Sequence, residues 1–446
     1  MTDAASIMKQ GYESLPMEEM KGRQKELLKF LGDDIFILLS GYDCMRNRYF
    51  GYPYRQESSF LYLTGFEERP SVVVFDATAD APVTIYVKDK IIQKEIWEGF
   101  ATGPVKAKER YPVDKAVDIV SLESNLSKQL KGRTVHYTQV PLHSLNPTIN
   151  KLIENAGASI CNENTALDKL KEMRTIKSKW EIDQIKQAIK LTKESHHATM
   201  QQGPLSEYEY ELEAIFEYTF KKQGSRSVSF ETIIASGSNA TCQHYVSNNA
   251  KMNREDLVLV DGGCEWNHYA GDITRTWPLS GKFSSSQRDL YQVVLTAQKA
   301  AVAMASPNVR MYDLHLKAAE VLVEGLKDLG LAHGNTEDII ETGAYKDFWP
   351  GGLSHQMGLD VHDISTPHLF SGPHAEHNLR PGMILTIEPG FYSQAFNCQI
   401  PEKYSRVGIR IEDDVLITEE GSENLSIDIV KEIHDVETMV QTNLNK

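Results

Sequence analysis

Two acidic residues stand at the ends of apolar segments within one stretch of the sequence, Leu257–Thr276, which reads LVLVDGGCEWNHYAGDITRT. Asp261 closes an apolar run and precedes a Gly-Gly pair, whereas Asp272 opens a run of strand-forming residues. We expect a buried strand, a turn and a return strand here, with the two acids on adjacent strands. A buried carboxylate costs free energy unless it is hydrogen-bonded, paired or bound to a metal. A cation between the two acids is the simplest way to remove their repulsion.

Three later segments carry similar side chains. His355 lies in the glycine-rich stretch GGLSH, and His362 follows in GLDVHD. Glu388 ends the apolar run ILTI and precedes a Pro-Gly pair, which repeats the pattern of an apolar strand, an acid and a turn. In VGIRIEDD, period-two alternation puts Arg410 and Glu412 on the face opposite the apolar residues. Acids and an imidazole thus stand at the ends of several predicted strands that are far apart in the sequence.

Taken singly, each of these residues has an ordinary structural interpretation. An acid after a strand is commonly a turn or cap residue, and an isolated histidine is more often a hydrogen-bonded core residue. Together, the carboxylates and the imidazole suit two divalent ions, chosen from Mn²⁺, Co²⁺, Fe²⁺ and Zn²⁺. A hydroxide bridging two such ions is a nucleophile at neutral pH, because the metals lower the pKa of water. The joint pattern therefore predicts a hydrolytic metal centre.

The composition is that of an ordinary globular protein, with 446 residues, 41% hydrophobic and 24% charged. The net charge of −15 argues against nucleic acid or an anionic membrane surface as the main partner. The sequence contains five widely spaced cysteines and no CxxC pair, which favours a reducing compartment. No apolar run approaches the length of a membrane span, and the N-terminus lacks an apolar signal core. We therefore expect a cytoplasmic protein.

The first part of the chain alternates strand-like and helix-like segments, which predicts an α/β domain. Strands are expected at Ile35–Leu39, Phe60–Leu63, Val72–Phe75, Val83–Val87 and Val135–Tyr137, and helices at 17–31, 90–97 and 116–130. The polar, charged stretch 162–178 predicts the domain junction. We accordingly expect an N-terminal domain over residues 1–173 and a C-terminal domain over 174–446.

The second part has long helical patterns and strands that return late in the chain, which predicts an α+β domain. Helices are expected at Trp180–Gln201, from Ser206 onward, and at Ser286–Ala305 and Tyr312–Leu329, and strands at Ile384–Glu388 and Val407–Ile417. Ser206 and Glu209 have the spacing of a capping box. The pair His196-His197 is expected to face solvent on the first of these helices.

At these residues the sequence resembles the metal-dependent "pita-bread" peptidases, and within them aminopeptidase P (Xaa-Pro aminopeptidase). The matching motifs are CQHY, VDGGCEWNHYAGDITRTWP, GLSHQMGLDVHD, LRPGMILTIEPGFY and VGIRIEDDV in the second half of the chain. YPYRQESSFLYLTGF and EIWEG match in the first half, so the resemblance covers nearly the whole chain. It implies an N-terminal aminopeptidase P-type domain and a C-terminal pita-bread catalytic domain that cleaves the bond between an N-terminal residue and proline.

The resemblance also implies a role for individual residues. Asp272 and Glu412 would bridge two metal ions, Asp261 would hold one ion, and His355 with Glu388 the other. Manganese is the first expectation for both ions, with cobalt, zinc and iron as alternatives.

Glu388 would also accept the proton of the attacking water, in the role that the resemblance implies. His244 and His362 would contact the substrate and stabilise the tetrahedral intermediate. Arg410 would orient carboxylates and help to bind the peptide. Trp97 matches a tryptophan that reaches the active site of a neighbouring subunit, and the resemblance implies a homodimer or a homotetramer.

One position departs from the family pattern. Aminopeptidases P usually have a histidine four residues before the metal-binding histidine, and here that position is Gly351. The departure affects the substrate pocket rather than the ligands. Three alternatives remain: a prolidase that takes only Xaa-Pro dipeptides, a processing aminopeptidase with no strict need for proline, and a metal-free binding protein on the same fold. The complete ligand set disfavours the last.

Overall fold

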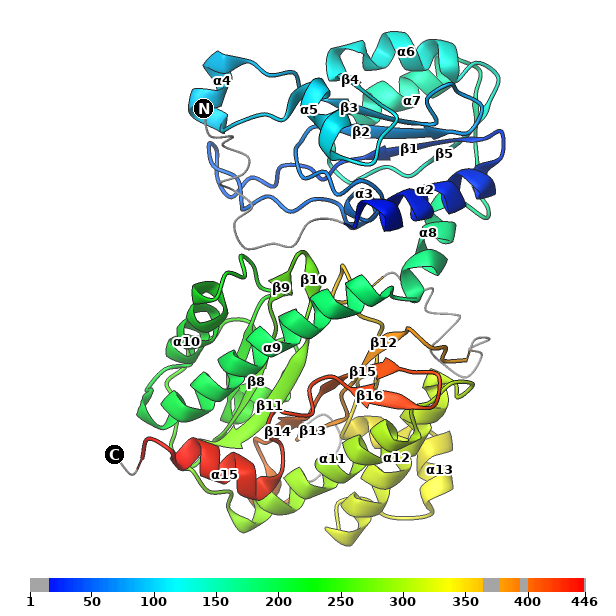
Figure 1. Ribbon diagram of the computed structural model, residues 1–446. Helices are drawn as coiled ribbons and strands as arrows, with labels where there is room; N and C mark the ends of the chain where they lie inside the picture. The colour runs from blue at the N-terminus through cyan, green and yellow to red at the C-terminus, as the bar shows by residue number, and fades with distance from the viewer. Residues whose placement is uncertain (1–15, 364–377, 394–399, 445–446) are drawn as a thin grey trace. The chain divides into compact units, whose positions relative to one another are not determined.

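The computed structural model describes residues 16–363, 378–393 and 400–444. The chain forms two compact units, Met1–Met173 and Arg174–Lys446, which are described separately (Figure 1). None of the helices within the described ranges is long and apolar enough to cross a membrane.

The first unit is built on a six-stranded mixed sheet with the order β4-β3-β2-β1-β5-β6. Strand β2 is antiparallel to both of its neighbours, β1 and β3, whereas β4, β5 and β6 each join a neighbour in parallel. The strands are β1 Ile35–Leu39, β2 Val72–Asp76, β3 Val83–Val87, β4 Lys115–Asp118, β5 Thr134–Tyr137 and β6 Ser159–Ile160. The helices are α2 Met17–Leu31, α3 Ser58–Thr64, α4 Ile92–Glu98, α5 Gly103–Arg110, η1 Ile119–Ser121, α6 Leu122–Gln129, α7 Asn146–Asn155 and α8 Ala166–Thr175.

Two expectations for this unit were wrong. Residues 60–63 lie in helix α3 and not in a strand, because the Glu57 side chain accepts a hydrogen bond from the Phe60 backbone at 2.7 Å and Gly65 ends the helix at φ +64°. All residues of α3 are buried, so no polar face reveals the helical period. The helix expected over 116–130 begins as strand β4, and α6 starts only at Leu122.

The second unit holds two three-stranded antiparallel sheets, β11-β8-β7 and β12-β15-β16, and the hairpin-like pairs β9-β10 and β13-β14. Its strands are β7 Ile233–Ser236, β8 Leu257–Gly262, β9 Glu265–Trp266, β10 Tyr269–Ala270, β11 Ile273–Pro278, β12 Ile384–Ile387, β13 Gly390–Tyr392, β14 Gly408–Arg410, β15 Asp413–Ile417 and β16 Ser422–Asn424. The strand expected over 407–417 is broken between β14 and β15 because the two halves pair with different partners.

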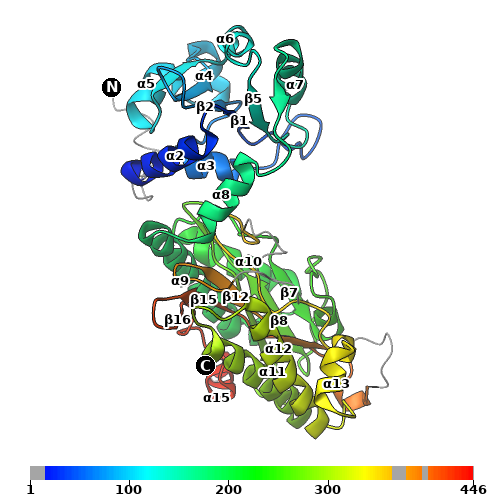
Figure 2. The same ribbon diagram turned by 90° about the vertical axis from the view of Figure 1, so that its right-hand side faces the viewer.

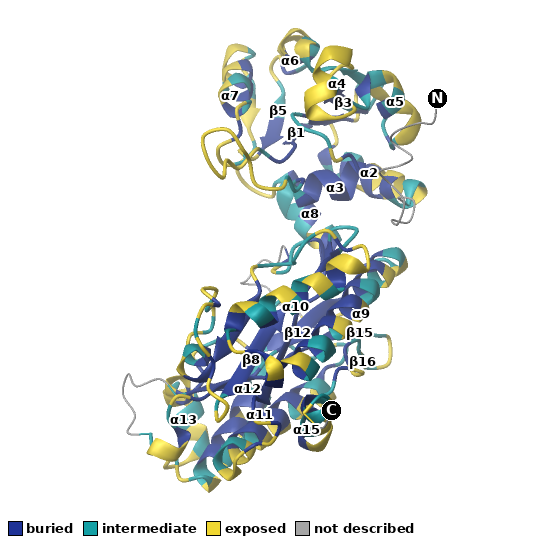
Figure 3. Ribbon diagram, turned by 90° about the vertical axis from the view of Figure 1, so that its left-hand side faces the viewer, coloured by how far each residue is buried: buried dark blue, intermediate teal, exposed yellow. Residues whose placement is uncertain are grey.

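Helices cover these strands. The longer ones are α9 Lys179–Gln202, α10 Glu209–Lys222, α11 Ser285–Met304 and α12 Met311–Asp328. Shorter ones are η2 Gly203–Leu205, η3 Gly237–Thr241, α13 Thr336–Glu341, η4 Ala344–Asp347, η5 Glu402–Tyr404 and α15 Ile433–Gln441. Figures 1 and 2 show α11 and α12 packed side by side, as α9 and α10 are. Their apolar faces meet the strands in one core, and Figure 3 shows those strands as buried.

The histidine pair on α9 does not face solvent as expected. His196 is fully buried, its Nε2 lies 2.9 Å from the carbonyl oxygen of Ile273, and its ring meets Phe216 edge-on. Burial lowers the pKa of His196 to about 3, with a contribution from the nearby Arg275. The ring is therefore neutral at neutral pH and donates its Nε2 proton to Ile273, next to the predicted ligand Asp272.

We expect the His196→Asn variant to lose less stability on acidification than the wild type. The unfolded histidine binds a proton below about pH 6.5, but the folded one does not until about pH 3, so stability falls as the pH decreases through this window. Between pH 7 and pH 5 the difference should be about 2 kcal/mol, measured by urea unfolding without metal. His434→Asn, at an exposed position on α15, is the control and should follow the wild type. Equal pH dependence in all three proteins would contradict the assignment.

Candidate metal centre

Strands β8 and β11 place Asp261 and Asp272 at one end of an antiparallel pair. Asp261 lies opposite Thr274 in the register, and Asp272 directly precedes β11. Between them the chain turns back through β9 and β10, where a Cβ on Gly263 would lie 1.7 Å from the carbonyl oxygen of Gly271. Only glycine permits this close approach of two backbone segments. The Gly-Gly pair after Asp261 is thus part of the turn that returns the chain to Asp272.

The second sheet supplies the two glutamates. Glu388 directly follows β12, and Glu412 lies in the break between β14 and β15. Strands β12 and β15 pair with Ile387 opposite Asp413, so both glutamates lie at the same end of the sheet. The backbone N–H of Glu412 also donates to the carbonyl oxygen of Thr274 at 3.1 Å, which connects this end to β11.

The segment that carries His355 runs beside β12. The backbone N–H of Thr386 donates to the carbonyl oxygen of His355 at 3.0 Å, and that of Glu388 donates to Leu353 at 2.9 Å. The hydroxyl of Thr386 accepts a hydrogen bond from the His355 backbone at 3.2 Å. These contacts fix the imidazole next to the glutamate that ends the strand.

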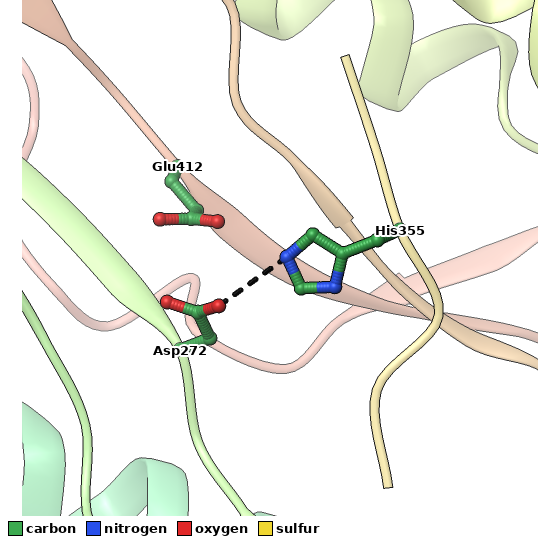
Figure 4. Close-up of side chains that lie close together, drawn as sticks. All are labelled: Asp272, His355 and Glu412. Carbon is green, nitrogen blue, oxygen red and sulfur yellow. Dashed lines mark ion pairs between the residues drawn. The ribbon is translucent and has the colours of Figure 1, made fainter. Parts of the chain in front are cut away.

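Asp272, His355 and Glu412 converge, and one potential ligand atom of each lies within 4.8 Å of the others (Figure 4). His355 Nε2 is 3.4 Å from Asp272 Oδ2 and 3.7 Å from Glu388 Oε1. Glu388 therefore borders the cluster. The structure thus places four of the five predicted ligands close together: Asp272, His355 and Glu412 in the cluster, and Glu388 beside His355.

Asp261 joins the site through Arg410. The Arg410 guanidinium donates to Asp261 Oδ2 at 2.6 Å, to the Thr274 hydroxyl at 2.9 Å and to the Tyr392 hydroxyl at 2.7 Å. The Thr274 hydroxyl in turn donates to Glu412 Oε2 at 2.7 Å. Arg410 thus contacts Asp261, and Thr274 connects Arg410 to Glu412.

In the metal-free protein the pKa values of several of these side chains are raised. Burial raises the pKa of Asp272 to about 6 and that of Glu388 to about 7. Burial also raises the pKa of Glu412 well above its usual range, with further contributions from Asp272 and Glu388. Burial opposes the charged form of His355, but its hydrogen bond to Asp272 and the charge of Glu388 raise its pKa to about 9. Asp272, Glu388 and Glu412 thus lie close together in a buried site, where their negative charges disfavour one another.

The residues present fit divalent metal ions. Asp261 Oδ1 is buried and has no hydrogen-bond partner among the residues that the structure describes. An unsatisfied buried carboxylate oxygen is costly, and metal coordination would satisfy it. Carboxylate and imidazole donors together suit Mn²⁺, Co²⁺, Fe²⁺ or Zn²⁺, and an ion would also offset the repulsion among the acids.

The two further histidines lie near this cluster. The ring of His362 has its centroid 4.2 Å from that of His355. Partial burial, together with the charges of His355 and His244, lowers the pKa of His362 to about 4. A neutral imidazole at neutral pH is able to donate or accept one hydrogen bond. His244 is exposed and close enough to His362 to affect its titration.

Ion pairs behind His362 fix its segment. The buried Asp363 binds Arg174 at 2.5 Å and Lys177 at 3.0 Å, and Arg174 also binds Asp360 at 2.7 Å. Two cations and two acids therefore hold the GLDVHD segment in one conformation, with His362 between the acids in the sequence.

The sequence analysis did not identify Thr274 and Tyr392, which contact Arg410. The sequence pattern could have indicated Thr274, since it stands two residues after Asp272 on a strand and therefore shares its face. No sequence pattern indicates Tyr392, because its hydroxyl reaches Arg410 only through the pairing of β13 with β14, where Gly390 lies opposite Arg410.

Comparison with known proteins gives the family. The pattern of metallopeptidase family M24 matches residues 183–419, and that of the aminopeptidase P N-terminal domain matches residues 20–137. The Xaa-Pro aminopeptidase of Haemophilus influenzae is 36% identical over 431 residues, which cover 96% of this chain and 98% of the relative. The mitochondrial intermediate cleaving peptidase 55 of Arabidopsis thaliana is 31% identical, covering 96% and 83%. Zinc-substituted Escherichia coli aminopeptidase P in complex with product superimposes with a TM-score of 0.90 at 32% identity, covering 97% and 99%.

A pita-bread domain whose strand ends bring carboxylates and an imidazole together defines a metal-dependent hydrolase of peptides. The chain belongs to metallopeptidase family M24 and carries the aminopeptidase P N-terminal domain. It is a metal-dependent aminopeptidase. The family and the fold class expected from the sequence, an α/β domain followed by an α+β pita-bread domain, are confirmed.

Proposed function

We propose that this aminopeptidase hydrolyses the bond between an N-terminal residue and a following proline, using two divalent metal ions. The observation that carries the proposal is the convergence of Asp272, His355 and Glu412 with Glu388 at their border. Asp261, Asp272, His355, Glu388 and Glu412 would hold the ions. The unsatisfied Asp261 Oδ1 supports its assignment as a ligand. Manganese is the proposed metal.

When bound, the ions supply an activated water and polarise the scissile carbonyl. Glu388 would accept the proton of that water, since its carboxylate borders the cluster, 3.7 Å from His355 Nε2. It would return that proton to the leaving proline nitrogen. His362 and His244 would hydrogen-bond the oxygen on which charge develops, an effect worth a few kcal/mol per donor. Arg410 would hold Asp261 in place and contact the peptide.

The substrate class is tested by comparing three peptides, Xaa-Pro-Xaa, Xaa-Pro and Xaa-Ala-Xaa, each with Mn²⁺ and with chelator. We expect metal-dependent release of the first residue from the proline tripeptide, at a rate at least about tenfold above the alanine analogue. Cleavage of the dipeptide alone would instead identify a prolidase. Cleavage without metal would contradict the proposal.

A second candidate is an aminopeptidase that processes protein N-termini without a strict need for proline. The likeness to the Arabidopsis intermediate cleaving peptidase favours it. Equal cleavage of the proline and alanine tripeptides would support this candidate.

Gly351 is the position at which the pocket departs from the family pattern. A Cβ there would lie 3.1 Å from Oε1 of Gln243, so the Gln243 carboxamide lies directly against the glycine. Gln243 also precedes His244, and its carbonyl oxygen lies 3.4 Å from Arg410 Nη2. We propose that Gln243 fills space that a larger residue at 351 would occupy, and that it alters substrate preference. Gly351→His should change the ratio of kcat/KM between peptides but leave the metal content unchanged.

We also propose a homodimer or homotetramer in which Trp97 reaches a neighbouring subunit. Trp97 is 88% exposed on α4, which Figure 3 colours as exposed, and Ile96 beside it is 77% exposed. Exposed apolar side chains grouped on one short helix are typical of an interaction site. The odd number of separated cysteines supports a cytoplasmic location.

A further inference from the structure

Glu209 is a buried carboxylate for which the proposed chemistry has no use. The sequence suggested that it forms a capping box with Ser206, but this expectation was wrong. Helix α10 begins at Glu209 itself, and the Ser206 hydroxyl donates to the carbonyl oxygen of Gln202 at 3.2 Å. The Glu209 side chain points elsewhere and is 0% exposed.

Both oxygens of this carboxylate accept hydrogen bonds from one loop. Oε1 accepts from the backbone N–H of Ser236 at 2.8 Å, from the Ser236 hydroxyl at 2.8 Å and from Asn239 Nδ2 at 2.9 Å. Oε2 accepts from the Tyr245 hydroxyl at 2.8 Å and from the backbone N–H of Ala250 at 3.0 Å. Hydrogen bonds to an ionised carboxylate are roughly twice as strong as neutral ones. Together they offset the cost of burying the charge.

The donors to Glu209 lie at several places along the segment that carries His244. Ser236 ends strand β7 and Asn239 lies in η3, at the start of the loop that leads to β8. Ala250 lies near the other end of the same loop, and Tyr245 directly follows His244. One side chain thus ties the start, the middle and the end of the segment that presents His244. A cap for α10 would need only contacts within the helix's own first turn.

We propose that Glu209 is a positioning residue that holds the His244 loop in the geometry needed for substrate contact. The inference rests on the proposed role of His244. The loop is exposed at His244, whereas Glu209 is fixed on a buried helix face. Misplacing a substrate-contacting group by about 1 Å costs on the order of 100-fold in rate.

The test is a double-mutant cycle on kcat/KM for the Xaa-Pro-Xaa tripeptide with Mn²⁺. Glu209→Gln replaces one carboxylate oxygen, an acceptor, by an amide nitrogen, a donor, so the hydrogen bonds of the loop to that atom are lost. We expect kcat/KM to fall by about 10- to 100-fold at unchanged metal content. In a His244→Ala background the same substitution should change kcat/KM by less than about threefold, because both act through one group. Glu211→Gln is the matched control. Glu211 lies in the same helical turn but accepts from the Glu207 backbone, outside the loop.

Hydrogen exchange of residues 237–250 provides a readout that needs no substrate. We expect Glu209→Gln to increase exchange there and Glu211→Gln to leave it unchanged. Hydrogen exchange that is unchanged in Glu209→Gln would overturn the inference. So would a fall in kcat/KM on Glu209→Gln that is as large in the His244→Ala background as in the wild type. If His244→Ala is as active as the wild type, the role proposed for His244 fails, whereas the exchange result still decides whether Glu209 holds the loop. If Glu209→Gln does not fold, Tyr245→Phe removes one of the five hydrogen bonds and is taken through the same cycle.

Discussion

Glu412→Gln is expected to abolish binding of at least one metal ion and to lower kcat/KM by about 1,000-fold, or about 4 kcal/mol of transition-state stabilisation. Glu412 lies with Asp272 and His355 in the cluster of potential ligands and is one of the proposed ligands of the ions. An amide presents one weak oxygen donor where the carboxylate offers two charged ones. Metal content after dialysis and steady-state hydrolysis of the Xaa-Pro tripeptide measure the two effects.

The same variant should be more stable than the wild type when metal is absent. Burial raises the pKa of Asp272 from 3.8 to about 6 and that of Glu388 from 4.5 to about 7, and it also raises the pKa of Glu412 well above its usual range. A raised pKa means that the folded state binds more protons than the unfolded state, so stability falls as the pH rises through the window between the two values. The metal-free wild type should therefore lose stability from about pH 4 upward, and Glu412→Gln should lose less.

Thermal unfolding with chelator between pH 4.5 and pH 8 checks this second effect. Added Mn²⁺ should reverse the order of the two proteins, because a ligand that binds only the folded wild type stabilises it. Glu423→Gln is the control, since Glu423 is exposed and pairs with Lys186 at 2.7 Å. A Glu412→Gln protein with full metal content and full activity would contradict the assignment of this ligand.

The sequence singled out Asp272, His355 and Glu412, which the structure brings together, but it misassigned some of the elements of the fold. The acids were recognisable because each follows or precedes a buried strand, where a carboxylate needs a partner. The pairing of β8 with β11 follows from two apolar runs separated by a glycine-rich turn, and the structure has this pairing. The convergence of the acids from two sheets was not visible in the spacing of the residues alone. It came from the resemblance to a known family.

The errors have physical causes of the same kind. Helix α3 was predicted as a strand because burial on all sides removes the periodic signal. Ser206 and Glu209 match a capping box in spacing, but tertiary hydrogen bonds with the loop beyond β7 use the Glu209 carboxylate instead. His196 was placed in solvent because the polar side chain alone does not reveal a buried acceptor at Ile273. For Glu209 and His196 a contact distant in the sequence decided the outcome.

A buried ion cluster directly behind Glu412 leads to the other prediction with a large effect. Arg275 and Asp413 are both fully buried and pair at 2.7 Å, and Lys431 forms a second ion pair with Asp413. Arg275 also donates to the carbonyl oxygens of Glu412 at 2.5 Å and of Ile429 at 3.0 Å. The guanidinium therefore joins β11 to the backbone of a proposed ligand, and the cations hold the pKa of Asp413 well below its usual range despite its burial.

We expect Arg275→Met to destabilise the protein by about 3–5 kcal/mol, because it breaks the buried pair with Asp413 and leaves the buried carbonyl oxygens of Glu412 and Ile429 without this donor. Urea unfolding measures the loss, and Arg288→Met is the control. Arg288 pairs with Glu437 at 2.6 Å at a partly exposed position, where an ion pair contributes less than about 1 kcal/mol. Adding Asp413→Asn to Arg275→Met should lower the stability further, since the second substitution also removes the partner of the buried Lys431. Equal effects of Arg275→Met and Arg288→Met would show that the buried cluster does not hold the strands together. A large loss accompanied by weaker metal binding would instead connect the stability of β11 and β15 to the position of Glu412.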